Sequence, residues 1–372
     1  MFEMYKELYP MDNITYRSYL RTFNTKFKLG FGLPRSDTCK TCDELFTKMI
    51  NSNNEVEMNA ISNELGKHQE TAEVAYATLK ADVNMATGRN TLVVLCVDLQ
   101  QVILTPNLTH SDVYYQRQYS NYNFCIHNMG ENIGNMFLWH EHIGKRGSAE
   151  IASCILKYIT SNFKPLEAGE IKKLILWSDR CVEQNNNWTI LSVCYYLIKL
   201  NYFTEVNQKF LTSGHSFLPC DRDFALIEKK KRISKLYTPE DVINMIKTAK
   251  TENPFKICEM KLEDFKNFME ITELIKINSE CKITKARWIQ LTLDDPNTLR
   301  LRSSHELSES WSNYSIANGK VDSGRNNIPN LDNLLPSREK NIDICENKKK
   351  DLLTMVKYLP NYAKQFYEDI CK

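Results

Sequence analysis

Four acidic side chains fall where an apolar strand is expected to end or a helix to begin. Asp98 and Asp179 each follow an aliphatic run, and Glu150 and Asp221 lie in the first turn of expected helices. Strand ends and helix starts meet at one edge of an α/β sheet, so we expect these carboxylates to converge. Like charges this close raise one another's pKa unless a cation neutralises them. The spacing therefore predicts a divalent-metal site.

The chemistry that follows from such a site is phosphodiester cleavage or strand transfer. Mg²⁺ and Mn²⁺ take oxygen ligands and leave room for phosphate oxygens. Two such ions can activate a water or a 3′-hydroxyl and stabilise the leaving oxygen. His215 precedes Asp221 by six residues, where it could ligate a metal, orient the attacked phosphate or carry a proton. Asp223 could replace Asp221 as the ligand.

Each acid also has a purely structural interpretation. Asp98 could be a turn residue and Asp179 a loop start, because Asp favours both positions. Glu150 could do no more than interact favourably with the dipole of its helix, and Asp221 could be a helix cap. All four, however, fall where one architecture requires a carboxylate.

That architecture is an α/β core of the ribonuclease H plan, a mixed five-stranded sheet flanked by helices. The apolar runs predict strands at 92–97, within 112–129, and at 135–141, 173–177 and 203–206. Helical spacing predicts helices from Ser148, over Trp188–Leu200 and from Asp221. We expect this catalytic domain over residues 91–235, a helical region over 1–90, and an α+β domain over 236–372.

A Cys-x-x-Cys pair in the helical region indicates a structural zinc site. Cys39 and Cys42 have the spacing of half a zinc knuckle, and His68 supplies a third ligand. For the fourth ligand, Asp37, Asp43 and a thiol from elsewhere in the chain or from another chain remain open. The alternative is that the cysteines are plain thiols and His68 is a core histidine.

Basic residues cluster at two places near the acids. One run follows the last expected helix of the catalytic domain, and a pair precedes Glu150; the residues are Lys229, Lys230, Lys231, Arg232 and Lys235, and Lys145 and Arg146. These side chains could track a phosphate backbone. The run could equally be a solvated face or a nuclear-localisation signal.

Composition places further bounds on function. The 372 residues carry 48 basic and 46 acidic side chains, so a uniformly basic nucleic-acid binder is excluded. No apolar run is long enough to span a bilayer and the first residues do not form a signal peptide, so we expect a soluble, intracellular protein. The 12 cysteines are then expected to form no disulfides and, outside the Cys39/Cys42 pair, to be free thiols.

The chain resembles the transposon-derived, ribonuclease H-like proteins of insect and other animal genomes, which are similar in outline to DDE transposases. The segments that carry the resemblance are 34–43, 97–101, 146–154, 177–179, 214–224, 348–353 and 358–360. The resemblance implies an acidic metal site at Asp98, Asp179 and the His215/Asp221 motif, with Glu150 as a fourth member. Family members carry a longer N-terminal portion, so we expect a shortened copy. They also commonly have Asn where this chain has Ala149, which we interpret as neutral.

We therefore expect a nuclear, or imported cytoplasmic, enzyme that cuts or joins DNA with two Mg²⁺ or Mn²⁺ ions. RNA remains open as a substrate, because metal chemistry of this kind does not depend on the sugar. The apolar stripe from Ile61 to Leu79 could pack on its own domain or form a homodimer seam. The alternative function is a domesticated, catalytically inactive protein that binds nucleic acid or a protein partner.

Overall fold

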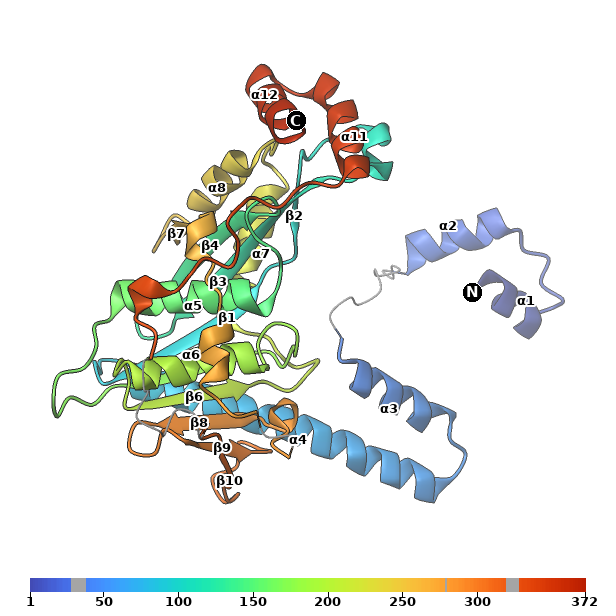
Figure 1. The fold of residues 1–372 in the computed structure, drawn as a ribbon. Helices are drawn as coiled ribbons and strands as arrows, with labels where there is room; N and C mark the ends of the chain where they lie inside the picture. The colour runs from blue at the N-terminus through green and yellow to red at the C-terminus, as the bar shows by residue number, and fades with distance from the viewer. Residues whose placement is uncertain (28–37, 278–279, 319–327) are drawn as a thin grey trace.

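A ten-stranded mixed sheet forms the centre of the molecule. The computed structural model describes residues 1–27, 38–277, 280–318 and 328–372. The strands follow the order β10-β9-β8-β6-β5-β1-β3-β4-β7, and β2 pairs with β3 beside this path. Helices cover both faces of the sheet (Figure 1). The mixed α/β fold expected from the sequence is therefore confirmed.

Five strands occupy the middle of the sheet, in the order β4-β3-β1-β5-β6. Their bounds are β1 Leu92–Leu99, β3 Tyr119–Asn128, β4 Ile133–His140, β5 Lys173–Ser178 and β6 Glu205–Phe210. β1, β5 and β6 run parallel, whereas β3 is antiparallel to both β1 and β4. β1 is apolar over nearly its whole length because it is covered on both faces.

The sheet is wider than the five strands expected, because the C-terminal part of the chain adds strands at both edges. β7 (Lys256–Glu259) pairs in parallel with β4, and an antiparallel ribbon continues from β6; it consists of β8 Trp288–Thr292, β9 Thr298–Arg302 and β10 Ser312–Ser315. The short β2 (Ile103–Thr105) pairs with β3. The domain boundaries near residues 90 and 235 stay predictions.

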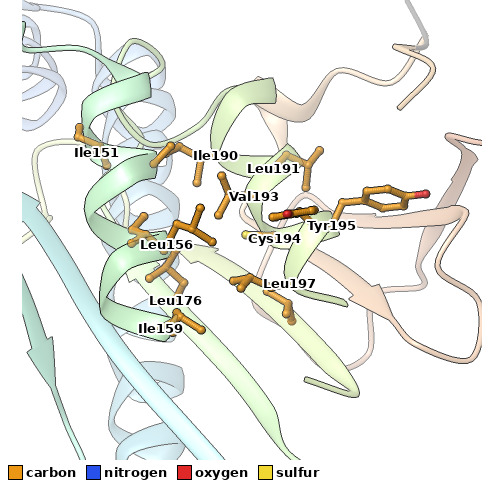
Figure 2. Packing of buried hydrophobic residues seen from close by; sticks show 14 of the residues in the cluster. Ile151, Leu156, Ile159, Leu176, Ile190, Leu191, Val193, Cys194, Tyr195 and Leu197 are labelled. Atoms are coloured by element: carbon orange, nitrogen blue, oxygen red, sulfur yellow. The ribbon is translucent and has the colours of Figure 1, made fainter. Parts of the chain in front are cut away.

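Alternate residues of β1 point into two separate cores, as the two-residue period of a strand requires. Leu95 and Val97 pack with α5 (Ser148–Asn162) and α6 (Trp188–Lys199). Figure 2 shows this first core, in which side chains of α5 interlock with those of α6. Burying one such aliphatic side chain contributes about 1.5–3 kcal/mol, so this core holds β1 and β5 in place.

The second core lies on the other face of the sheet. Val94 and Cys96 of β1 pack there with residues of three helices: α4 Glu55–Ala86, α7 Pro219–Lys231 and α8 Pro239–Lys247. Ala75 and Leu79 of the apolar stripe on α4 belong to this core. The C-terminal half of that stripe is therefore buried within the chain.

The N-terminal helices precede α4 in the order α1 (Phe2–Leu8), α2 (Tyr16–Lys26) and α3 (Lys40–Asn51). Thr15 caps α2 by accepting a hydrogen bond from the Ser18 N–H, and α1 and α2 are drawn apart from the sheet (Figure 1). No helix in the described ranges is both long and apolar enough to cross a membrane.

The C-terminal helices α11 (Glu346–Met355) and α12 (Asn361–Ile370) form a third, smaller core with Tyr119 at the start of β3. A further helix, α9 (Met269–Glu273), packs on α6. Five short 3₁₀ turns complete the described elements: Ser111–Tyr115, Leu262–Asp264, Ile283–Lys285, Leu331–Asn333 and Val356–Tyr358. The first of these occupies the beginning of the range 112–129, where only a strand was expected.

Candidate functional site

Asp98 and Asp179 lie side by side at the ends of two neighbouring parallel strands. In the register of β1 with β5, Cys96 is opposite Trp177. Two residues further along each strand, the same register places Asp98 opposite Asp179. Parallel strands are about 4.8 Å apart, so the two carboxylates emerge at one edge of the sheet, as the sequence predicted.

The electrostatics of Asp98 show that Asp221 belongs to the same group. Burial raises the pKa of Asp98 to about 7, and the neighbouring charges of Asp179 and then Asp221 add to the rise. A hydrogen bond from the Leu99 N–H (2.8 Å) and the charge of Arg146 act in the opposite direction. Three acids therefore repel one another around Asp98, which is the situation that a bound cation relieves.

Asp179 is held by polar contacts from the loop that follows β5. Its Oδ1 accepts hydrogen bonds from Asn185 Nδ2 at 2.6 Å and from the Cys181 N–H at 3.1 Å. The backbone of Asn185 is fixed in turn, because its carbonyl accepts a bond from Gln208 Nε2 at 2.7 Å. Sequence reasoning missed Asn185, since the Asn-rich run 185–187 gives no signal beyond that of a loop.

Asp221 combines a structural role with its place near Asp98. It lies in the first turn of α7, and its Oδ2 accepts a hydrogen bond from the Leu218 N–H at 2.6 Å. The cap-type contact considered for Asp221 is therefore present. One carboxylate oxygen serves the start of the helix while its charge acts on Asp98.

Glu150 and Asp223 each pair with a basic side chain that the sequence analysis did not anticipate. The buried Glu150 Oε1 accepts hydrogen bonds from Arg338 Nη2 and from the Lys145 N–H, both at 3.0 Å. The buried Asp223 lies 2.6 Å from His127 Nδ1. The pairings with Arg338 and His127 could not be foreseen, because these two residues are distant in sequence from the acids that they contact.

The cysteine pair finds its missing ligand in His215. Cys39 Sγ lies 3.2 Å from His68 Nε2, and Cys42 Sγ lies 3.3 Å from His215 Nε2. All four ligand atoms are within 4.8 Å of one another, and in the described part of the chain no other group of His, Cys, Asp or Glu has this geometry. Tetrahedral zinc places sulfur and nitrogen ligands about 3.6 Å apart. The cluster could therefore hold a metal such as zinc.

Neither of the two acids considered as the fourth ligand belongs to the observed cluster. Asp43 accepts a hydrogen bond from the Thr38 hydroxyl, and Asp37 lies outside the described residues. The assignment of His215 to catalysis differs from its observed place, since its ring points into the sulfur cluster. The reason is the loop between β6 and α7, which passes directly over the start of α3.

A glycine makes this close approach possible. A Cβ on Gly214 would lie 2.5 Å from Cys39 Sγ, and the backbone there has φ +79°, a conformation that favours glycine. The same loop is tied to α4 a second time, because Tyr76 Oη accepts a hydrogen bond from the Phe217 N–H at 2.9 Å. The cluster thus joins α3 and α4 to the segment that precedes Asp221.

The ionisation of the cluster also suits a metal. Burial lowers the pKa of His68, with the charges of His215 and Arg287 adding to the effect, and this favours the neutral imidazole that binds metals. Burial and the neighbouring Cys39 raise the pKa of Cys42. A divalent cation would reverse that second shift by binding the thiolate.

The basic residues of interest lie on two separate segments, the turn before α5 and the end of α7. Arg146 is exposed, donates to the Gln100 carbonyl at 3.4 Å and acts electrostatically on Asp98, and Lys145 beside it is exposed. Along the end of α7, Lys231 pairs with Glu228 at 2.6 Å. The other members of this run are exposed or half-buried: Lys229, Lys230, Arg232 and Lys235.

Comparison with known proteins gives one family match. Residues 124–305 match the model of a domain of unknown function, DUF7869. The matched range includes Asp179, His215 and Asp221, whereas Asp98 and the cysteine pair lie before it. No curated protein and no solved structure matches the chain.

Proposed function

We propose that the protein is a metal-dependent enzyme that cleaves or transfers phosphodiester strands of DNA at Asp98, Asp179 and Asp221. The observation that carries this proposal is the state of Asp98, whose pKa is raised to about 7 by burial and by two neighbouring acids. Carboxylates held together against their mutual repulsion are typical of sites that bind divalent cations.

The order of the central strands supports a ribonuclease H-like core. Three antiparallel strands (β1, β3 and β4) are followed by α5, β5, α6, β6 and α7, and the strand order is β4-β3-β1-β5-β6. The acids lie at the end of β1, the end of β5 and the start of α7. This agreement also supports the resemblance to transposon-derived, DDE-transposase-like proteins.

Three acids hold the ions in this proposal, and Glu150 serves as the partner of Arg338. Two Mg²⁺ or Mn²⁺ ions would activate the attacking water or 3′-hydroxyl and stabilise the leaving oxygen. The chain orients the ligands through Asn185 on Asp179 and the Leu218 N–H on Asp221. A divalent ion would bring the carboxylates closer together than they lie here, since their oxygens are not all within 4.8 Å.

We assign the Cys/His cluster a structural role beside this site. Zinc bound by Cys39, Cys42, His68 and His215 would fasten the loop that ends at Asp221, six residues after the last ligand. His215 would then act on catalysis through the position of that loop, without contact to the phosphate.

DNA is the proposed partner because Arg146 and the basic end of α7 offer positive charge near the acids. A nuclear location follows from this substrate and from the run Lys229–Arg232. A homodimer, as in other recombinases, would have to use a surface other than the buried positions of the α4 stripe, which include Ile61 and Leu79.

The test is nicking and cleavage of labelled DNA and RNA in Mg²⁺, in Mn²⁺ and in EDTA, with wild type, Asp98→Asn and Asp179→Asn. We expect metal-dependent cutting of DNA that either substitution lowers by at least about a hundredfold, the effect of removing one group from a catalytic unit. Asp343→Asn, which changes an exposed acid that is not one of the proposed ligands, is the control and should cut normally. Absence of cutting by wild type, with DNA binding retained, would leave the catalytically inactive binding protein as the function.

A further inference from the structure

Two arginines meet beside Asp179, and neither belongs to the site described above. Arg180 directly follows Asp179, and its Nη2 donates to the Thr284 carbonyl at 2.8 Å. Arg287 follows Thr284 by three residues, and its Nη1 donates to Thr212 Oγ1 at 3.0 Å. The Arg180 side chain therefore reaches the segment that leads into β8, and the Arg287 side chain reaches from that segment to the residues after β6.

Backbone hydrogen bonds tie these segments to the acidic end of the sheet. The Phe210 N–H, at the end of β6, donates to the Arg287 carbonyl at 2.9 Å. The next residue along, Leu211, donates its N–H to the Ser178 carbonyl at 3.1 Å, directly before Asp179. The backbone of Arg287 is thus paired with the end of β6, and β6 is the neighbour of β5, the strand that ends beside Asp179 and Arg180.

Neither arginine has an acidic partner in the described part of the chain. Each is half-buried and makes the one side-chain hydrogen bond given above, although a guanidinium offers several N–H donors. Burial lowers the pKa of both groups, and the charge of Arg180 lowers that of Arg287 further. Two half-buried positive charges without an acidic partner destabilise the fold unless an anion binds beside them.

We propose that Arg180 and Arg287 together bind a backbone phosphate of the nucleic-acid strand, next to the phosphodiester linkage that lies at Asp179. This inference rests on the proposed function. Planar guanidinium groups bind phosphate through paired N–H donors. A tetrahedral phosphate has enough oxygens to accept from both. The adjacent carboxylates repel a free anion, so a phosphate tethered in a strand that other basic residues hold is favoured over inorganic phosphate.

The experiment measures binding of a short labelled DNA duplex to the zinc-loaded protein, without added Mg²⁺ or Mn²⁺, as a function of salt, for wild type, Arg180→Gln and Arg287→Gln. The control is Arg89→Gln, which removes the same charge from an exposed turn before β1, roughly 25 Å away at the opposite end of that strand. We expect each site variant to bind on the order of tenfold more weakly and to lose about 0.9 from the slope of log K against log salt. Arg180→Lys should retain most of the slope, because it keeps the charge.

Thermal unfolding supplies a second readout that a merely structural arginine would not give. In the absence of an anion, Arg180→Gln and Arg287→Gln should not unfold at a lower temperature than wild type. If the substitution relieves charge repulsion, the unfolding temperature should rise by about a degree or more. Millimolar inorganic phosphate tests the free anion as the ligand. Phosphate that stabilises wild type while the duplex slope is unchanged in the variants would overturn the proposal.

The outcomes separate this inference from the proposed function. Equal duplex binding by wild type and both arginine variants would overturn the phosphate site, even if the wild type cuts DNA. Weaker binding by the arginine variants, together with a wild type that cuts nothing in Mg²⁺ or Mn²⁺, would support the phosphate site and contradict the catalytic proposal.

Discussion

At the scale of single residues, Asp98 is an acid whose pKa the fold raises far above its ordinary value. Its pKa is raised from 3.8 to about 7, first by burial and then by Asp179 and Asp221. The shift makes the ionised form costly in the folded state. The folded protein therefore binds this proton more tightly than the unfolded chain does.

The sign of the pH dependence follows from this shift. Stability from the protonated Asp98 is fully present below about pH 4 and is lost as the pH rises towards 7. The loss amounts to roughly 4 kcal/mol if the whole shift is expressed. Asp98→Asn should thus be more stable than wild type at about pH 8 and similar to it at about pH 4, in urea unfolding without divalent ions. Asp343→Asn is the matched control. A variant no more stable than wild type at the higher pH would contradict the raised pKa.

The residue scale also shows what the sequence could and could not reveal. Asp98 and Asp179 could be predicted to converge, because an acid directly after an apolar strand marks the strand end. The ion pair of Glu150 with Arg338 and the half-buried pair of Arg180 and Arg287 could not, since each joins segments more than one hundred residues apart. Pairing of this kind depends on the tertiary fold.

At the scale of elements, the loop between β6 and α7 links the two candidate metal sites. It carries His215 to the cysteines, is held by Tyr76 through the Phe217 N–H, and ends in the turn that Asp221 stabilises. A rearrangement at the Cys/His cluster would therefore be transmitted to Asp221.

Gly214→Ala tests whether the cluster needs this loop. The new Cβ would clash with Cys39 Sγ at 2.5 Å, so we expect the variant to lose bound zinc in elemental analysis and to melt at a temperature that chelator no longer changes. Gly88→Ala is a close control, because its φ of +74° is similar and its Cβ would meet nothing within 4 Å. Backbone strain should cost both variants about 1–2 kcal/mol. Full zinc content in Gly214→Ala would contradict the proposed ligand set.

Element prediction succeeded where apolar periodicity was strong and failed where buried polar residues interrupt it. The helices from Ser148, from Trp188 and near Asp221 are present at the expected places. β6 was expected at 203–206 but runs over Glu205–Phe210, because Lys209 within it is buried against Asp82 of α4 at 2.7 Å. A lysine in a strand gives no sign in the sequence of a partner more than a hundred residues earlier.

At the scale of the whole molecule, one sheet collects contributions from most of the chain. The C-terminal strands extend both edges, so Arg287, directly before β8, lies at the end of β6, the strand next to the one that ends beside Asp179. The N-terminal helices α3 and α4 reach the same end through the cysteine pair and His68. The proposed active site is therefore assembled from segments far apart in sequence. The net charge of the whole chain is only +2, so positive potential at the proposed active site has to come from local groups such as Arg146.

Joint binding of a divalent cation by Asp98, Asp179 and Asp221 is tested most directly by titrating the zinc-loaded protein with Mn²⁺ and following free Mn²⁺ by electron paramagnetic resonance. Wild type should bind Mn²⁺ reversibly, and Asp98→Asn, Asp179→Asn and Asp221→Asn should each weaken binding at least about tenfold, the loss of one charged ligand. Asp343→Asn should bind as wild type does. If wild type does not bind Mn²⁺, or if all three site variants bind it as wild type does, the carboxylate site is contradicted.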